Sequence, residues 1–144
     1  PPVKCIPPGE IVNSLTSNGC VITGSVINSV LSPGVRVEKG ATVKDSVIMN
    51  DTIIRADAVV DCCIIDKQVE IGPGAKLGVG KNDTPNQLEP DNINTGITII
   101  GKRGIIPEGA TIGRNCRIDP DTTPDDYETL NVKSGESILK IKIA

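Results

Sequence analysis

The side chains that most often carry catalysis are scarce in this chain of 144 residues, which contains no histidine and five cysteines. The cysteine count is odd and no Cys-x-x-Cys pair occurs, so we interpret the cysteines mostly as small hydrophobic side chains in a reduced protein. Without histidine and suitable spacing, a zinc site is not predicted. Residues 119–128 hold five acids but lack the spacing of a calcium loop, and they are predicted to be a solvated loop.

The elements that must position any site follow from an internal repeat. Residues 26–42, 43–59 and 60–76 align over 17 columns, and valine opens each segment. A short fixed period predicts a solenoid, in which each coil buries its apolar face only by stacking on its neighbours. Apolar residues recur in steps of five or six, which predicts an all-β, single-stranded parallel β-helix of about five triangular coils. The apolar residues are Cys20, Val26, Leu31, Val37, Val43, Ile48, Ile54, Val60, Ile65, Ile71 and Leu77, followed by Ile100, Ile106, Ile112 and Ile118.

The corners of the coils have their own residue types. Three residues after many of the apolar positions, the chain has residues that tolerate a positive φ, as a sharp corner requires. They are Gly34, Gly40, Asp57, Gly74, Gly109 and Asn115. The next position is small, and we predict that it points into the narrow core. The small residues are Ala41, Ala58, Ala75, Ala110 and Cys116.

The repeat also divides the chain into segments. Residues 1–14 are rich in proline and are predicted to be a linker or entry strand, and residues 15–144 form the β-helix domain. Within it, residues 78–96 are polar and predicted to be an inserted loop, and a C-terminal tail begins at residue 119. The alternation in SILKIKIA predicts a terminal strand in which Ile138, Ile141 and Ile143 are prominent.

Charge and hydropathy exclude two classes of partner. The net charge is −3 and no basic stripe is present, which argues against binding to nucleic acid. No apolar run approaches the length of about 18 residues that spans a membrane, so no membrane association is predicted. The chain also lacks the pattern of a signal peptide, and we expect a cytoplasmic location.

Five ordered segments of the chain form a specific set. They are NSVLSPGVRVEKGATVKDSVIM, IIDKQVEIGPG, KNDTPNQLEPD, GITIIGKRGIIPEGATIGRNCRI and KSGESIL. Together they resemble the C-terminal domain of bacterial glucose-1-phosphate adenylyltransferase, the ADP-glucose pyrophosphorylase family. The resemblance implies a left-handed β-helix. It also implies a parent enzyme that uses Mg²⁺ to make ADP-glucose and pyrophosphate from ATP and glucose 1-phosphate for glycogen synthesis. The N-terminal nucleotidyltransferase domain of that parent is absent from this sequence.

The resemblance further implies a regulatory and oligomerisation role. In that family the domain packs on its own N-terminal catalytic domain, helps to build a homotetramer and lines a pocket for a phosphate or sugar-phosphate effector. Its IDKxxxIG and KSG motifs imply that Asp66, Lys67 and Lys133 form the anion site here, with Asp66 orienting Lys67. Arg114 and Arg117 are weaker candidates. No catalytic residue, metal ligand or cofactor is implied within this segment.

Two other functions remain open. A noncatalytic paralogue of the enzyme, with a role only in assembly, would contain the same domain. A hexapeptide acyltransferase is the less favoured alternative, because in the known families the acyl-transfer base is a histidine and this chain has none.

Overall fold

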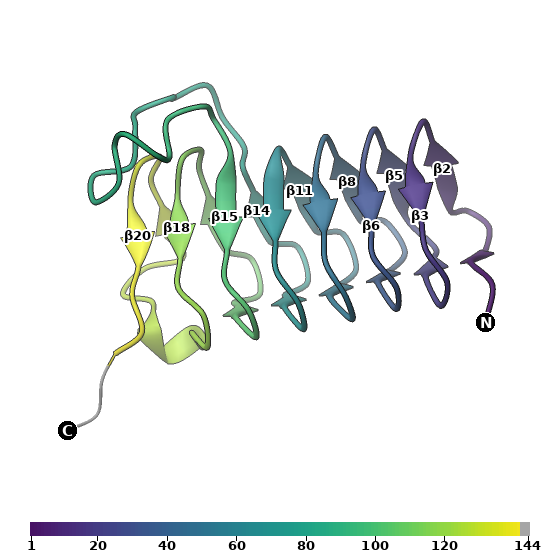
Figure 1. Ribbon diagram of the computed structural model, residues 1–144. Helices are drawn as coiled ribbons and strands as arrows, with labels where there is room; N and C mark the ends of the chain where they lie inside the picture. Colours follow the sequence, from purple (N-terminus) through teal and green to yellow (C-terminus); the bar gives the residue numbers. More distant parts are fainter. Residues whose placement is uncertain (142–144) are drawn as a thin grey trace.

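Residues 1–141 of the computed structural model form a parallel β-helix whose short strands fall in turn on three sheets (Figure 1). Sheet A contains β1 (Lys4–Cys5), β4 (Val21–Ile22), β7 (Arg36–Val37), β10 (Ile53–Ile54), β13 (Glu70–Ile71) and β16 (Ile105–Ile106). Sheet B contains β2 (Glu10–Val12), β5 (Ser25–Ile27), β8 (Thr42–Lys44), β11 (Val59–Asp61), β14 (Lys76–Leu77), β17 (Thr111–Ile112) and β19 (Asn131–Val132). Sheet C contains β3 (Leu15–Thr16), β6 (Val30–Leu31), β9 (Val47–Ile48), β12 (Cys63–Ile65), β15 (Thr98–Ile100), β18 (Arg117–Ile118) and β20 (Ser137–Ile138).

The repeat of the sequence becomes the register of the sheets. Ile53 pairs with Arg36 and with Glu70, which lie 17 residues before and after it. The inward residues stack into columns and are almost completely buried, as Leu31, Ile48 and Ile65 are in sheet C. Each such side chain stabilises the fold by about 1.5–3 kcal/mol. The parallel β-solenoid predicted from the sequence is therefore confirmed.

The predicted number of coils, about five, is too low. The three sheets contain six, seven and seven strands within the described residues. The first coil already begins within residues 1–14, where β1 and β2 pair with β4 and β5. The last coil is completed by β19 and β20. These outer coils do not keep the five- and six-residue apolar spacing, so the repeat did not reveal them.

The corner predictions are confirmed. All six residues predicted to have a positive φ have one, from Gly34 to Asn115. The four alanines and Cys116 that follow corner residues are buried. The cysteines differ in part from the prediction, because Cys5 is exposed and Cys62 is only half-buried. Cys62 occupies a corner position with a φ of 53°, outside the inward columns of the core.

The inserted segment leaves the solenoid without interrupting the stacking of coils. Ile64 of β12 pairs with Ile99 of β15 although 35 residues separate them, and Ile99 then pairs with Arg117. The additional residues, 78–96, arch from β14 over β18 and β20 before they return to β15 (Figure 1). No helix in the described part of the chain has the length and apolar character needed to cross a bilayer.

The C-terminal end of the prism is closed by a short segment in place of a seventh sheet A strand. It consists of the 3-10 helix η1 (Pro124–Asp126) and Tyr127, whose side chain packs against the core. Asp126 accepts hydrogen bonds from the backbone N–H groups of Thr123 and Ile141, which hold the pKa of its carboxyl below the ordinary value. The predicted terminal strand is present as β20, which contains Ile138, whereas Ile143 lies outside the described residues.

Candidate anion-binding edge

Asp66 and Lys67 open the turn between β12 and β13, on the edge where sheet C meets sheet A. The carboxylate of Asp66 accepts the backbone N–H of Lys67, with 2.7 Å between nitrogen and Oδ1. Asp66 therefore fixes the backbone of the turn from which the Lys67 side chain extends. That side chain is exposed, and it makes no ion pair within residues 1–141.

A second lysine, Lys102, occupies the same turn position one coil further on. The N–H of Arg103 donates to the carbonyl of Lys67 at 3.0 Å, and the flanking strands keep their pairing across this turn. The backbones of Lys67 and Lys102 are thus one coil apart, about 4.8 Å. Lys102 is half-buried and, like Lys67, has no ion-pair partner in the described part of the chain.

Two like charges in neighbouring coils favour an anion between them. At 4 Å in water, two unit charges repel each other by about 1 kcal/mol, and an anion relieves that repulsion. An ammonium group binds phosphate as a compact point charge with three donors. The edge carrying Lys67 and Lys102 is therefore a candidate site for a phosphate group.

Arg103 and Asp121 lie on the same edge. The guanidinium of Arg103 forms a two-pronged pair with Asp121, with 2.6 Å between Nε and Oδ1 and 3.1 Å between Nη2 and Oδ2. These hydrogen bonds lower the pKa of the Asp121 carboxyl, and the charges of Lys140 and Lys102 act in the same direction. Asp121 thus already places one negative group among the cations of this edge.

Lys133 lies on a different edge of the prism. It follows β19 in the last coil, where sheet B meets sheet C, and its backbone N–H donates to Glu136 at 2.7 Å. The structure brings Lys102, and not Lys133, beside Lys67. The signal for Lys102 is present in the sequence, because residues 65–77 written over residues 100–112 place the two lysines in one column.

The two arginines predicted as weaker candidates hold the inserted loop. Arg114 pairs with Asp83 of the loop, with 3.0 Å between Nη1 and Oδ1. Arg117 pairs with Glu89 of the loop at 3.5 Å and with Asp119 of its own coil at 3.0 Å. Both guanidinium groups therefore have carboxylate partners within the domain.

Two buried asparagines fix the same loop: Asn86, for which the sequence predicted no role, and Asn115, which it predicted only as a corner residue. Asn86 donates through Nδ2 to the carbonyl of Asn115 and to Oγ of Ser137, each at 3.0 Å. Its Oδ1 accepts the N–H groups of Leu88 and Glu89. Asn86 is completely buried. Its amide therefore hydrogen-bonds the loop to the solenoid away from solvent.

Asn115 makes the reciprocal contacts from the solenoid side. Its Oδ1 accepts the N–H of Gly96 at 2.7 Å, at the end of the loop. Its Nδ2 donates to the carbonyls of Asp83 and Thr84 at 3.1 and 3.2 Å. Asn86 lies outside the repeat, and the corner position of Asn115 predicts only its positive φ.

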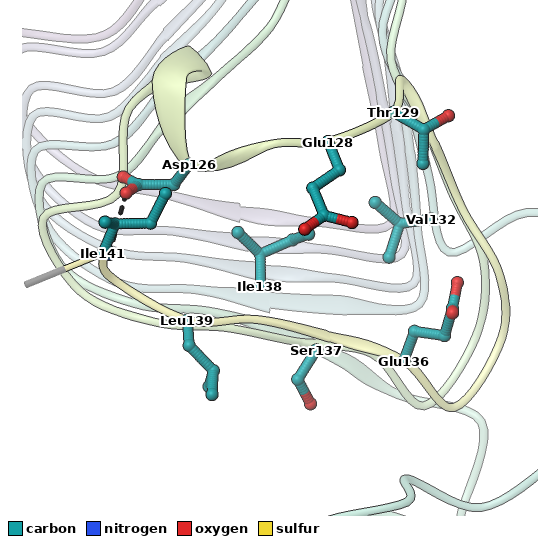
Figure 2. A pocket seen from close by; sticks show the side chains of 9 residues that line it. All are labelled: Asp126, Glu128, Thr129, Val132, Glu136, Ser137, Ile138, Leu139 and Ile141. Carbon is teal, nitrogen blue, oxygen red and sulfur yellow. Dashed lines mark hydrogen bonds between the residues drawn. The ribbon is translucent and has the colours of Figure 1, made fainter.

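The pocket at the C-terminal end of the prism has the opposite charge. Figure 2 shows Glu128 and Ile138 turned toward its middle, with Asp126 and Glu136 at its sides. Among residues 1–141, the lining includes no lysine or arginine. An anion would be repelled there, so this pocket is not a candidate for a phosphate site.

The outward face of sheet C carries an apolar row. Leu15 pairs with Val30, Val30 with Val47, Val47 with Ile64, and Ile64 with Ile99, one residue on each of five neighbouring strands. Leu15, Val30 and Val47 are 72%, 42% and 38% exposed. The turns around the first two strands, within residues 13–20 and 28–35, carry no charged side chain. We call these five residues the sheet C row.

Comparison with known proteins agrees with this architecture. Residues 2–100 match the family described as GlmU-like, C-terminal hexapeptide. The chain is 48% identical over 142 residues to the glucose-1-phosphate adenylyltransferase of Thermomicrobium roseum, covering 98% of this chain and 33% of that protein. It is 41% identical over 134 residues to the enzyme of that name from Acetivibrio thermocellus, covering 93% of this chain and 31% of that protein.

A similar solved structure is the acetyltransferase domain of PglB from Neisseria gonorrhoeae, with a TM-score of 0.54 and 22% identity over 96% of this chain and 50% of that one. That likeness shows the fold alone. The chain spans about a third of the length of the curated relatives it matches. The chain belongs to the family of GlmU-like C-terminal hexapeptide domains and corresponds to the C-terminal part of glucose-1-phosphate adenylyltransferases.

Proposed function

We propose that this chain is the regulatory and oligomerisation domain of a glucose-1-phosphate adenylyltransferase, and that it binds a phosphate or sugar-phosphate effector at Lys67 and Lys102. The observation that carries this proposal is the stacking of two lysines in successive coils, neither of which has an ion-pair partner within residues 1–141. The parent protein would act in the cytoplasm with Mg²⁺, making ADP-glucose and pyrophosphate for glycogen synthesis. Its N-terminal catalytic domain would be the partner on which this domain packs.

Removing either lysine is expected to weaken the binding of inorganic phosphate to the 144-residue chain about tenfold, because each contact is charge-assisted. The variants are Lys67→Ala and Lys102→Ala, and the affinity is measured by NMR titration at low ionic strength, where screening is weak. Lys76→Ala is the matched control, since Lys76 is an exposed lysine on sheet B. Equal weakening by the control would mean that only net charge matters. Lys133→Ala in the same titration tests whether the KSG lysine also contributes.

In the intact parent protein the same variants separate regulation from catalysis. Lys67→Ala and Lys102→Ala should lose activation by phosphate-bearing effectors while basal pyrophosphate release from ATP and glucose 1-phosphate continues. A well-folded parent that releases no pyrophosphate would instead favour the noncatalytic paralogue with a role in assembly. Acyl transfer has weaker support. The acetyltransferase domain of PglB shares only the fold with this chain, and this chain has no histidine to act as the base.

For assembly, we propose that the outward face of sheet C contacts the same face of a second copy. A row of similar apolar residues can lie against itself around a two-fold axis, because such a contact uses one patch on both subunits. The five strands that carry the sheet C row make the free face about 20 Å long, because the inserted loop lies over β18 and β20. This size places the contact below the ~800 Å² per partner of a standard stable complex. The absence of charge around β3 and β6 is typical of an interface core.

A charge in the sheet C row is expected to dissociate this contact. Val30→Lys should raise the dissociation constant at least 100-fold, because an unpaired charge is costly to bury. Val59→Lys is the control, since Val59 faces outward on sheet B. The measurement is sedimentation equilibrium over a concentration series. A wild-type chain that stays monomeric at ~100 μM, or an equal loss in the control, would contradict this interface.

A further inference from the structure

Three residues form a second column on the edge that carries Lys67 and Lys102. Gln68, Arg103 and Asp121 occupy one turn position in successive coils, with φ values of 58°, 61° and 62°. The N–H of Asp121 donates to the carbonyl of Lys102 at 2.9 Å, just as the N–H of Arg103 donates to Lys67. Asp121 therefore lies one coil beyond Lys102 and two coils beyond Lys67. Arg103 directly follows Lys102 in the chain.

The pair between Arg103 and Asp121 has the geometry that an arginine uses for phosphate. Both prongs of the guanidinium fork meet carboxylate oxygens, at 2.6 and 3.1 Å, and a phosphate presents two oxygens in the same way. The side chains are 51% and 50% exposed, and ion pairs of that exposure contribute little to stability. A phosphate can thus replace the carboxylate at small cost to the fold.

We propose that Asp121 is a built-in competitor that sets the anion affinity of this edge by occupying Arg103. This inference rests on the proposed binding of phosphate at Lys67 and Lys102. Asp121 withholds the guanidinium of Arg103, which lies beside Lys102. A phosphate that binds must either displace Asp121 from Arg103 or bind without the arginine. Asp121 is thereby a residue that tunes affinity through Arg103.

The test is phosphate titration of the 144-residue chain carrying Asp121→Asn. Asparagine tolerates the left-handed φ, so the turn is preserved while the charge is removed. We expect phosphate to bind about fivefold more tightly. This factor corresponds to about 1 kcal/mol, the interaction energy of two unit charges about 4 Å apart in water. Asp121→Glu should keep the wild-type affinity. In the double variant with Arg103→Ala, the gain should disappear, because it acts through the guanidinium.

Asp51→Asn is the matched control. Asp51 occupies the same turn position with a φ of 60°, but two coils before Arg103. Its substitution removes the same charge from the same edge without freeing the arginine, and it should change the affinity less than twofold at about 0.15 M salt. Thermal unfolding midpoints of all variants are compared, so that a purely structural effect is recognised.

The outcomes separate this inference from the proposed function. Suppose that the wild type binds phosphate through Lys67 and Lys102 but Asp121→Asn leaves the affinity unchanged. In that case Asp121 does not compete with phosphate, whereas the proposed anion site at Lys67 and Lys102 is retained. The same holds if the tightening survives Arg103→Ala or is matched by Asp51→Asn. If neither the wild type nor Asp121→Asn binds phosphate, the anion site fails and the competitor fails with it.

Discussion

Replacing Gly78 with alanine is expected to lower the free energy of unfolding by about 3–5 kcal/mol, a large part of the stability of a domain this size. Gly78 is buried at the end of β14, where the inserted loop begins, and its φ is 74°. A Cβ at this position would overlap the carbonyl oxygen of Asp61 and approach Sγ of Cys63. The backbone cannot retreat, because the N–H of Gly78 is bonded to the carbonyl of Ile112 at 2.8 Å.

The matched control is Gly74→Ala. Gly74 also has a left-handed backbone, with a φ of 68°, but nothing lies within 4 Å of an added Cβ. This variant should show only the backbone cost of about 1–2 kcal/mol. Urea unfolding followed by circular dichroism measures both. If the two variants lose equal stability, the close approach between Gly78 and Asp61 is not what limits the site.

Replacing Asn115 with alanine is expected to cost about 3 kcal/mol and to release the inserted loop. The substitution removes three hydrogen bonds to loop backbone groups, at Gly96, Asp83 and Thr84. Each buried group left without a partner costs about 1–3 kcal/mol, although a loop that detaches regains water as a partner. The φ of 55° adds strain for alanine. Limited proteolysis within residues 78–96 should become much faster.

Asn28→Ala is the control for the backbone part of this effect. Asn28 is an exposed corner residue with a φ of 48°, and its side chain accepts one exposed hydrogen bond from Asn13. It should lose about 1 kcal/mol, with no change in loop cleavage. Cleavage in Asn115→Ala no faster than in Asn28→Ala would show that the loop is held by other contacts, such as the pairs of Arg114 and Arg117.

The repeat in the sequence was sufficient to predict the solenoid, its inward columns and its corners. A residue such as Ile54 or Ala58 contacts mainly the coils before and after its own, so one period specifies most of its neighbours. The same locality explains why Gly34 and Gly74 were recognised as corners, since a positive φ depends on the residue itself.

The tertiary structure established that Lys102 lies beside Lys67, a register that the alignment of residues 65–77 with 100–112 also contains. The period predicts columns, but an insertion changes the spacing from 17 to 35 residues, and this spacing brings Lys102 onto the edge of Lys67. The KSG motif did not indicate that Lys133 lies on a different edge of the prism from Lys67. The pairing of Asp121 with Arg103 follows from the same register and could not be read from either residue alone.

The anchors of the loop depend on the tertiary structure for a different reason. Asn86 contacts Asn115 and Ser137, which lie 29 and 51 residues away along the chain, and no repeat relates these positions. Their hydrogen bonds form because the loop folds back over the last coils. What the sequence determined by itself was the stacking of neighbouring coils. Contacts between the loop and the solenoid have no period, so only the folded chain decided them.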